Sequence, residues 1–451
     1  MAELLKLAEG VLARAAPGEE LEAYAVHRTV TTVQAGTGGV IRHVGRAETR
    51  GVGVRLLTNA RMGYASTADV SSDGLTTTVI RARQNATAGD PDEAVALPNP
   101  EPVRATTVLW DKALQRTSLE TKIGLATHLA RRVVGIHSQI RSIDTAEYYD
   151  EQVLTAVAST CGVRSEDRQG FAELSTDAIG QAAGGNVADY SYWCGRDPTS
   201  VDVDSLAQEA VSRTGRLMGQ LGKRRPTDAA VVLDRAVVGV LLAAVGRACS
   251  GGALSSGRSA FAGLHGSLVA ASEVDLADDG LCPAAPAAAL VDGEGVPRRR
   301  TDLIRAGVLV GALHSVTTAR AIGGNARTTG NARRMTHKSP PRAAPAALVL
   351  RPTCSLQELL AVAGEATYLQ QVSGSHSGIS SITGRVNVGG IGFLLHDGQP
   401  SSRLATISVA TSLQAFLSSI LMVADDVQAV PGSPVVASTV LCAPSWLASA
   451  P

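Results

Sequence analysis

The stretch that decides the fold of the C-terminal half is Ala229-Ala-Val-Val-Leu233, Asp234 and Val237-Val-Gly-Val-Leu-Leu-Ala-Ala-Val245, followed by Ser250-Gly-Gly-Ala-Leu-Ser-Ser-Gly257. The first segment is typical of a buried strand, because it is short, apolar and rich in β-branched residues. The aspartate then caps an apolar helix, and the glycine-rich segment ends it. A strand, a helix and a polar loop in this order often present a catalytic helix at a cleft.

This helix, however, carries no catalytic side chain. Between Arg235 and Ala248 there is no His, Asp, Glu or Tyr, and Cys249 and Ser250 are the first residues able to act as nucleophiles. The chain has 9 histidines, and no two of them lie three to five residues apart. No single helix or turn therefore supplies a pair of metal ligands, although distant histidines remain an alternative. We expect no catalytic residue and no metal in this chain.

Length and composition restrict the class of protein. At 451 residues the chain is long enough for two or three domains, and its 45% apolar content is enough for sizeable cores. Lys plus Arg and Asp plus Glu both number 41, so there is no net positive charge to attract nucleic acid. No apolar run is long enough to span a membrane, and the first residues include acids, unlike a signal peptide. We expect a cytoplasmic protein whose 6 cysteines are free thiols.

The pattern predicts an α+β fold in three domains, 1–103, 104–225 and 226–451. The first contains a helix, an extended segment from Leu21 to Gln34, a hairpin at 51–66 and a second helix. Four prolines between 89 and 102 mark the boundary. The second begins with a capping box at Thr117-Ser-Leu-Glu120 and continues with strands at 140–149, 153–163, 171–178 and 188–194 and a long helix. Both have helices against antiparallel sheets.

The third domain is larger and mixed. After the central stretch, a second capping box at Ser355-Leu-Gln-Glu358 starts a helix. Strands are expected at 368–372, 379–383 and 391–396, and a closing helix at 413–423.

The most cationic window of the chain lies between Asn325 and Pro341. It is either a solvated surface loop or a contact for an anionic group such as a peptide carboxylate. His376 lies in a serine- and glycine-rich loop that faces either solvent or a cleft. The candidate substrate-binding residues are Arg327, Arg333, Arg334, His337, Lys338 and His376.

Nearly the whole chain resembles the TldD/PmbA family, most strongly from Val231 to Val427. The similarity is carried by Val231-Val-Leu233, Gly239-Val-Leu-Leu-Ala-Ala-Val-Gly246, Ser259-Ala-Phe-Ala-Gly263, Asp292-Gly-Glu-Gly-Val-Pro-Arg298 and Gly390-Ile-Gly-Phe-Leu-Leu-His-Asp-Gly398. The resemblance implies two kinds of subunit. The TldD kind carries H-E-x-x-x-H on the central helix, which binds zinc and activates water. The TldE, or PmbA, kind lacks this motif.

This sequence resembles the TldE kind. At the place of the motif it has Ala243, Ala244 and, depending on a one-residue gap, Arg247 or Ala248. Its end also lacks the Cys-Gly segment from which the TldD kind draws a further zinc ligand. It departs from the family again at Arg385, where an acid is more usual.

The resemblance implies a non-catalytic subunit of a heterodimeric zinc metallopeptidase. The chain would line the cavity for a peptide or peptide-like substrate, which is cleaved at the zinc of a TldD-like partner, and would be inactive alone. Two alternatives stay open. One is an enzyme that acts alone on a small peptide-like metabolite, and the other is a regulatory binding protein without peptidase activity. Neither nucleic acid nor a membrane is expected as a partner.

Overall fold

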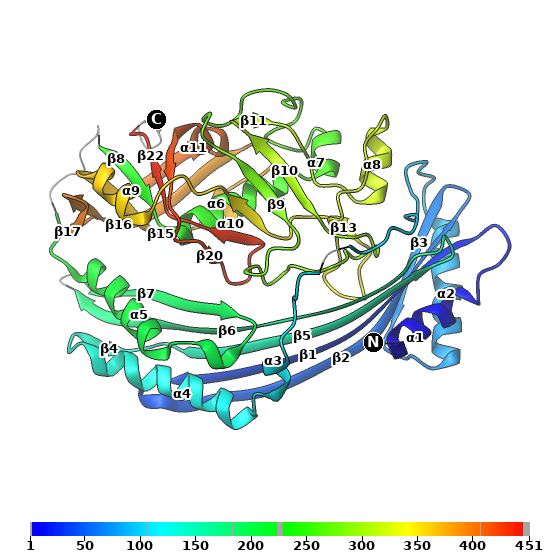
Figure 1. Ribbon diagram of the computed structural model, residues 1–451, viewed down its shortest axis with the longest axis horizontal. Helices are drawn as coiled ribbons and strands as arrows, with labels where there is room; N and C mark the ends of the chain where they lie inside the picture. Colours follow the sequence, from blue (N-terminus) through cyan, green and yellow to red (C-terminus); the bar gives the residue numbers. More distant parts are fainter. Residues whose placement is uncertain (1, 105, 183–184, 223–228, 406, 445–451) are drawn as a thin grey trace.

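The computed structural model describes residues 2–104, 106–182, 185–222, 229–405 and 407–444. Long strands form a curved sheet that runs along the whole molecule, and the C-terminal half sits in the concave, inner side of this curve (Figure 1). Helices lie against the outer side. The mixed α+β class expected from the sequence is confirmed. No described helix is long and apolar enough to cross a membrane.

The large sheet has seven strands in the described part of the chain, in the order β3-β2-β1-β5-β6-β4, with β7 on the other edge of β6. These strands are β1 (Glu20–Gly36), β2 (Val40–Thr58), β3 (Arg61–Thr67), β4 (Ile140–Ser142), β5 (Ala146–Ser159), β6 (Arg164–Ala182) and β7 (Gly185–Gly195). β1 pairs antiparallel with β2 on one side and with β5 on the other. The segments predicted as two N-terminal α+β units therefore share one continuous sheet.

The outer face of this sheet is covered by helices over two separate apolar clusters. The helices are α1 (Ala2–Leu12), α2 (Ser72–Ala88), α3 (Lys112–Arg116), α4 (Leu119–Ile136) and α5 (Val203–Met218). α1 and α2 pack on one end of the sheet, around Leu21 and Val54, and α4 and α5 on the other, around Tyr148 and Leu174. Alternation along the strands sends these side chains outward and their neighbours inward.

One helix start differs from the prediction. The Oγ of Ser118 accepts from the Thr121 N–H, so Ser118 is the N-cap of α4 and not Thr117. Thr117 instead ends α3, donating its N–H to the carbonyl of Ala113. A preceding five-residue helix, not visible in the apolar pattern, thus displaces the cap by one residue.

The C-terminal domain has two sheets with α6 between them. One sheet consists of β9 (Leu276–Asp279), β10 (Arg300–Arg305), β11 (Val308–Leu309), β14 (Leu348–Leu350), β20 (Gln428–Ala429) and β21 (Val435–Ala437). The other consists of β8 (Ala230–Leu233), β15 (Ala366–Ser373), β16 (Arg385–His396), β17 (Gln399–Arg403), β18 (Ile407–Ser412), β19 (Ile420–Val423) and β22 (Val440–Cys442). A short ribbon is formed by β12 (Ala332–Arg333) and β13 (Arg342–Ala343).

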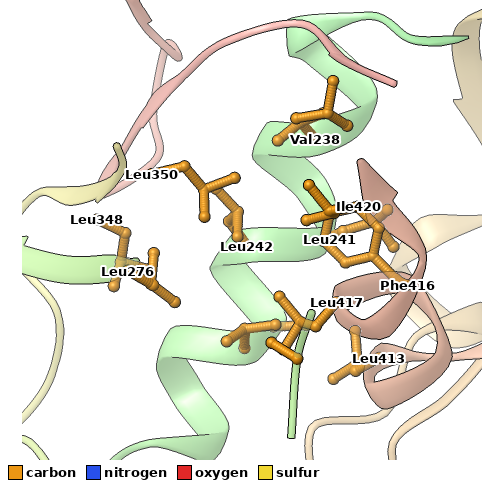
Figure 2. Packing of buried hydrophobic residues seen from close by; sticks show 14 of the residues in the cluster. Val238, Leu241, Leu242, Leu276, Leu348, Leu350, Leu413, Phe416, Leu417 and Ile420 are labelled. Atoms are coloured by element: carbon orange, nitrogen blue, oxygen red, sulfur yellow. The ribbon is translucent and has the colours of Figure 1, made fainter. Parts of the chain in front are cut away.

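The helices of this domain are α6 (Arg235–Ala248), α7 (Gly251–Ser255), α8 (Val316–Ile322), α9 (Leu356–Ala363), α10 (Ser375–Gly378) and α11 (Leu413–Ser419). α6 carries leucines and valines on opposite sides, and these fill the space between the sheets. Figure 2 shows Leu242 directed toward Leu276 and Leu348, and Leu241 toward Phe416 and Ile420. Asp234 caps α6 as predicted, accepting from the Ala236 N–H at 2.9 Å.

Gly246 allows this close packing. A Cβ at this position would lie 2.3 Å from a methyl carbon of Leu348, so any side chain there would push α6 away from β14. The helix is therefore fixed in position by its apolar sides and by a glycine at its closest approach.

Two predictions in this domain are wrong in part. Residues 379–383 are not a strand: the chain turns back on itself, with the Ser380 N–H donating to the Arg385 carbonyl and Gly384 at a φ of 74°. The predicted closing helix stops at Ser419, and residues 420–423 form β19 against β22. The Ser355 capping box is confirmed, with both reciprocal hydrogen bonds present.

Candidate functional site

The accessible side of α6 is the first place to search for catalytic groups. Ala236, Val240 and Ala243 are half-buried and Arg247 is exposed, at helical spacing, whereas the intervening positions are buried. Neither an aliphatic side chain nor a guanidinium ligates zinc, so this stripe does not fit a zinc ion. In the described ranges, no three His, Cys, Asp or Glu side chains lie close enough together to hold a metal ion.

A cavity of about 470 Å³ lies between the inner face of the large sheet and the C-terminal domain. We call it the interdomain cavity. Its sheet wall comes from β1, β5 and β6, and its opposite wall from residues 286–298 and 332–337. The side chains used below are Tyr24, Arg28, Glu147, Tyr149, Glu151, Phe171, Glu173, Arg298, Arg333, Arg334, Met335 and His337. The end of α6 is linked to this wall, because the Ser250 Oγ donates to the carbonyl of Ala343, and β13 pairs with β12.

Beside the cavity, a buried chain of charges joins the two halves of the molecule. Arg55 donates to Glu22 at 2.7 Å and to Glu294 at 2.8 Å, and Arg334 donates to the other oxygen of Glu22. All four side chains are at most 3% exposed. Two arginines against two glutamates leave no net charge, and this is the condition under which buried ion pairs are tolerated.

Arg334 is further fixed by the main chain and by an aromatic side chain. Its Nε donates to the Gly293 carbonyl at 2.7 Å, and its Nη1 donates to the Tyr64 hydroxyl at 3.2 Å. The guanidinium also lies over the Tyr24 ring, 4.9 Å from its centroid. Arg334 therefore forms part of the cavity wall.

His337 packs on the sheet at a glycine. A Cβ at Gly51 would lie 2.4 Å from the His337 Nε2, so only glycine admits the imidazole here. The Tyr64 hydroxyl donates to the His337 carbonyl at 2.7 Å. Burial, with Lys338 nearby, lowers the pKa of His337, and its buried Nδ1 has no hydrogen-bond partner among the described residues.

The sheet wall is acidic and aromatic. Arg28 and Tyr149 both donate to Glu151, which is therefore satisfied. Glu173 lies opposite Tyr149 on the neighbouring strand. Its side chain makes no hydrogen bond or ion pair with any residue that the structure describes. Burial, reinforced by the charge of Glu147, raises the pKa of Glu173 to about 7.

The opposite wall is basic. Arg298 is 9% exposed, and the only hydrogen bond of its side chain within the described chain runs from Nε to the Val291 carbonyl at 3.4 Å. Arg333 is half-buried and makes no side-chain hydrogen bond or ion pair with the described residues. Burial, and then the charge of Arg298, lowers the pKa of Arg333, so the two guanidinium groups are close enough to repel each other. Glu151, across the cavity, has a smaller and opposite effect.

The structure brings together half of the predicted substrate-binding residues. Arg333, Arg334 and His337 line the interdomain cavity. The other three, Arg327, Lys338 and His376, are not among its lining residues. Arg327 and Lys338 are exposed.

Sequence reasoning missed Arg298, Glu147 and Glu173 as cavity residues. One signal was present: β5 and β6 carry polar, charged or aromatic side chains at every second position, at 147, 149 and 151 and at 169, 171 and 173. This alternation predicts a polar face. It does not show that another domain encloses that face.

A second cavity, of about 560 Å³, lies on the outer face of the sheet between the two apolar clusters. It includes Lys122, which pairs with Asp150 and reaches the Thr31 hydroxyl at 3.4 Å. Its most buried charge is therefore satisfied internally, and the interdomain cavity is the stronger candidate.

Three family models match successive parts of the chain. Residues 21–86, 112–218 and 226–449 match the first, central and C-terminal domains of the PmbA/TldA metallopeptidases. The comparison with curated proteins gives no match.

Among solved structures, one from Thermotoga maritima, whose name proposes a modulator of a DNA gyrase, has a TM-score of 0.88 at 19% identity, covering 98% of this chain and 99% of that one. A similarly named protein from Bacteroides thetaiotaomicron has a TM-score of 0.84 at 20% identity, covering 98% of each chain. TldE from Thermococcus kodakarensis has a TM-score of 0.84 at 17% identity, also covering 98% of each. At these identities the structures show a common fold. Together with the three matched domains, they establish that the chain belongs to the PmbA/TldD metallopeptidase family.

Proposed function

We propose that this chain is the non-catalytic, TldE-like subunit of a heterodimeric zinc peptidase whose partner carries the metal. The observation that carries the proposal is the accessible stripe of α6, where Ala236, Val240, Ala243 and Arg247 offer neither a zinc ligand nor a general base. The likeness in fold to TldE of Thermococcus kodakarensis supports it. The complex would be a cytoplasmic one.

In this function the chain contributes binding and not bond cleavage. A zinc site needs its peptide held in line with the activated water, and positioning of this kind contributes several kcal/mol to a rate. The proposed contacts remain Arg327, Arg333, Arg334, His337, Lys338 and His376. Arg333 is the best placed of them, because its guanidinium lines the interdomain cavity and is not used elsewhere in the described structure. Arg334 and His337 hold the wall on which Arg333 lies.

The test is co-expression with a TldD-like subunit that contains H-E-x-x-x-H. We expect the two chains to co-purify in equal amounts, with about one zinc per heterodimer, and a mixed peptide substrate to be cleaved only by the complex. A variant of the partner without its motif histidines should still assemble and should lose both zinc and cleavage.

The proposal is wrong if this chain, purified alone, holds one zinc per molecule and cleaves peptides. It is also wrong if the two chains do not associate at micromolar concentrations.

A further inference from the structure

Several charged side chains that line the interdomain cavity without an ion-pair partner in the described structure lie on different walls according to their sign. Arg298 and Arg333 lie on the C-terminal wall, and Glu147 and Glu173 lie on the sheet wall. No ion pair in the described structure joins the two walls through Arg298, Arg333 or Glu173, although elsewhere on the same walls Arg28 pairs with Glu151 and Arg334 with Glu22. The chain therefore pairs the charges that it can pair internally and leaves these three without a partner.

The basic side is strained electrostatically. Two guanidinium groups repel each other, and one of them is 9% exposed. Three buried carboxyl groups, of Asp167, Asp278 and Asp292, are near enough to Arg298 to feel its charge, but none forms an ion pair with it. Asp278 and Asp292 also accept main-chain N–H groups, which orient them within the domain. An anion in the cavity would relieve the repulsion, since arginine pairs are well suited to binding carboxylates.

The acidic side has the complementary arrangement. The charge of Glu147 acts on the Glu173 carboxyl, and like charges in a partly dry site are costly. Glu147 accepts a hydrogen bond from the Gln34 amide, whereas Glu173 has no such contact among the described residues. A cation would stabilise both carboxylates.

The remaining lining is that of a ligand pocket. Tyr149 and Phe171 pack with ring centroids 5.8 Å apart, and Met335 is 77% exposed. The His337 Nδ1 adds a buried polar atom without a partner in the described chain. The lining mixes aromatic and apolar side chains with charged ones, and its volume of about 470 Å³ is in the range of small-molecule sites.

We propose that the interdomain cavity binds a zwitterion, a short peptide with free ends, whose carboxylate contacts Arg298 and Arg333 and whose ammonium group contacts Glu147 and Glu173. The cavity is built from one chain only. Binding therefore needs neither zinc nor the partner subunit, and it deepens the proposed function, on whose peptide contact at Arg333 it rests.

The first experiment is isothermal titration calorimetry of the purified chain with four dipeptides that end in alanine, leucine, phenylalanine or lysine. Each is used in the free form, with an acetylated N-terminus, and with an amidated C-terminus. At least one free dipeptide should bind, and either modification should weaken its binding tenfold or more. If no free dipeptide binds at millimolar concentration, or if the modified forms bind as well as the free form, the proposal is wrong.

The second experiment assigns each end to a wall. Arg333→Gln should weaken the free dipeptide about tenfold and leave the affinity for the amidated form unchanged, because that form lacks the carboxylate. Glu173→Gln should weaken binding of the free dipeptide about tenfold and leave the affinity for the acetylated form unchanged, because that form lacks the ammonium group. The matched controls are Arg81→Gln and Glu93→Gln, which remove the same charges at exposed positions outside the cavity. Equal losses for free and modified peptides would show a general effect on the fold and would contradict the assignment.

These outcomes are independent of the proposed function. A chain that binds free dipeptides but never joins a zinc subunit supports the cavity and rejects the heterodimer. A chain that assembles with a zinc subunit and supports cleavage, but binds no dipeptide alone, supports the heterodimer and rejects the cavity.

Discussion

The two faces of the large sheet are made by the same strands and are completed in different ways. On the outer face, small and aliphatic side chains meet α1, α2, α4 and α5 in two apolar clusters. On the inner face, the alternate residues of the same strands are largely charged or aromatic, and the C-terminal domain covers them. Burial on one face is achieved by apolar packing, and on the other by pairing of charges.

This difference shows where a ligand is expected. An apolar face is satisfied by contact alone, whereas an enclosed polar face needs a partner for each charge. The inner face finds partners for Arg55, Glu22, Glu151 and Arg334, and it leaves Glu173 without one in the described structure. The unpaired positions surround the interdomain cavity.

The largest effect is expected from breaking the charge pairing of the inner face. Arg55→Met removes the cation between Glu22 and Glu294 and leaves two buried carboxylates, so the free energy of unfolding should fall by about 3–5 kcal/mol. Urea unfolding measures this. The control is Arg50→Met on the same strand. Arg50 pairs with Glu3 at the surface, so its loss should lower the free energy of unfolding by less than about 1 kcal/mol. Equal, small changes in both variants would show that the inner pairing does not hold the domains together.

The outer face should respond to lost volume. Leu174 is fully buried against α4 and α5, so Leu174→Ala should lower the free energy of unfolding by about 2–5 kcal/mol. Differential scanning calorimetry measures this loss of stability. Ile80→Ala, in α2 and 45% exposed, serves as the control and should change stability by about 0.5 kcal/mol or less. If dipeptide binding is lost in Leu174→Ala while the folded fraction is unchanged, the two faces are not independent.

The smallest effect is expected from a change in pH, which alters stability through Glu173 on the inner face. The pKa of Glu173 is raised from its ordinary value of 4.5 to about 7, so between these values the folded protein keeps a proton that the unfolded chain has lost. Stability should therefore fall as pH rises from about 4.5 to 7 and level off above. Glu147, Tyr149 and Cys194 face this carboxyl from β5 and β7, and none of them is a cation.

The free energy of unfolding should fall less between pH 5 and pH 7.5 in Glu173→Gln than in the unchanged protein. Urea unfolding at both pH values measures this. Other titrating groups, such as Asp167 and Asp292, are present in both proteins, so their contributions cancel in the difference. Identical pH profiles would show that Glu173 is solvated.

The sequence was sufficient where a local signal decides the structure. Asp234 and Ser355 predicted the starts of α6 and α9, because capping depends on a few neighbouring residues. The hairpin of β2 and β3 was likewise visible from its turn and apolar alternation. The absence of zinc ligands on α6 could also be read directly, since it depends only on residue type.

The sequence was insufficient where distant segments meet. β5 and β6 were predicted as shorter pieces because the inward-facing half of each strand carries Glu, Gln and Asp, which interrupt the apolar signal. The interdomain cavity joins Glu173 of β6 to Arg298 and Arg333 of another domain, and no local pattern relates them. The turn at 379–383 was mistaken for a strand, since its two isoleucines suggested one, but only Ile379 packs in the core and Ile382 is exposed.

The position of β1 in the middle of the large sheet has a consequence for synthesis on the ribosome. β1 is made near the start of the chain, but its second neighbour, β5, is complete only at residue 159. Until then, the nascent chain has β3, β2 and β1 as a three-stranded sheet in which the outer edge of β1 is long and unpaired. Such edges are sites of aggregation, and late non-local pairing slows folding. A ribosome pause before residue 159 should therefore raise aggregation, and one after residue 195, when β7 is complete, should not.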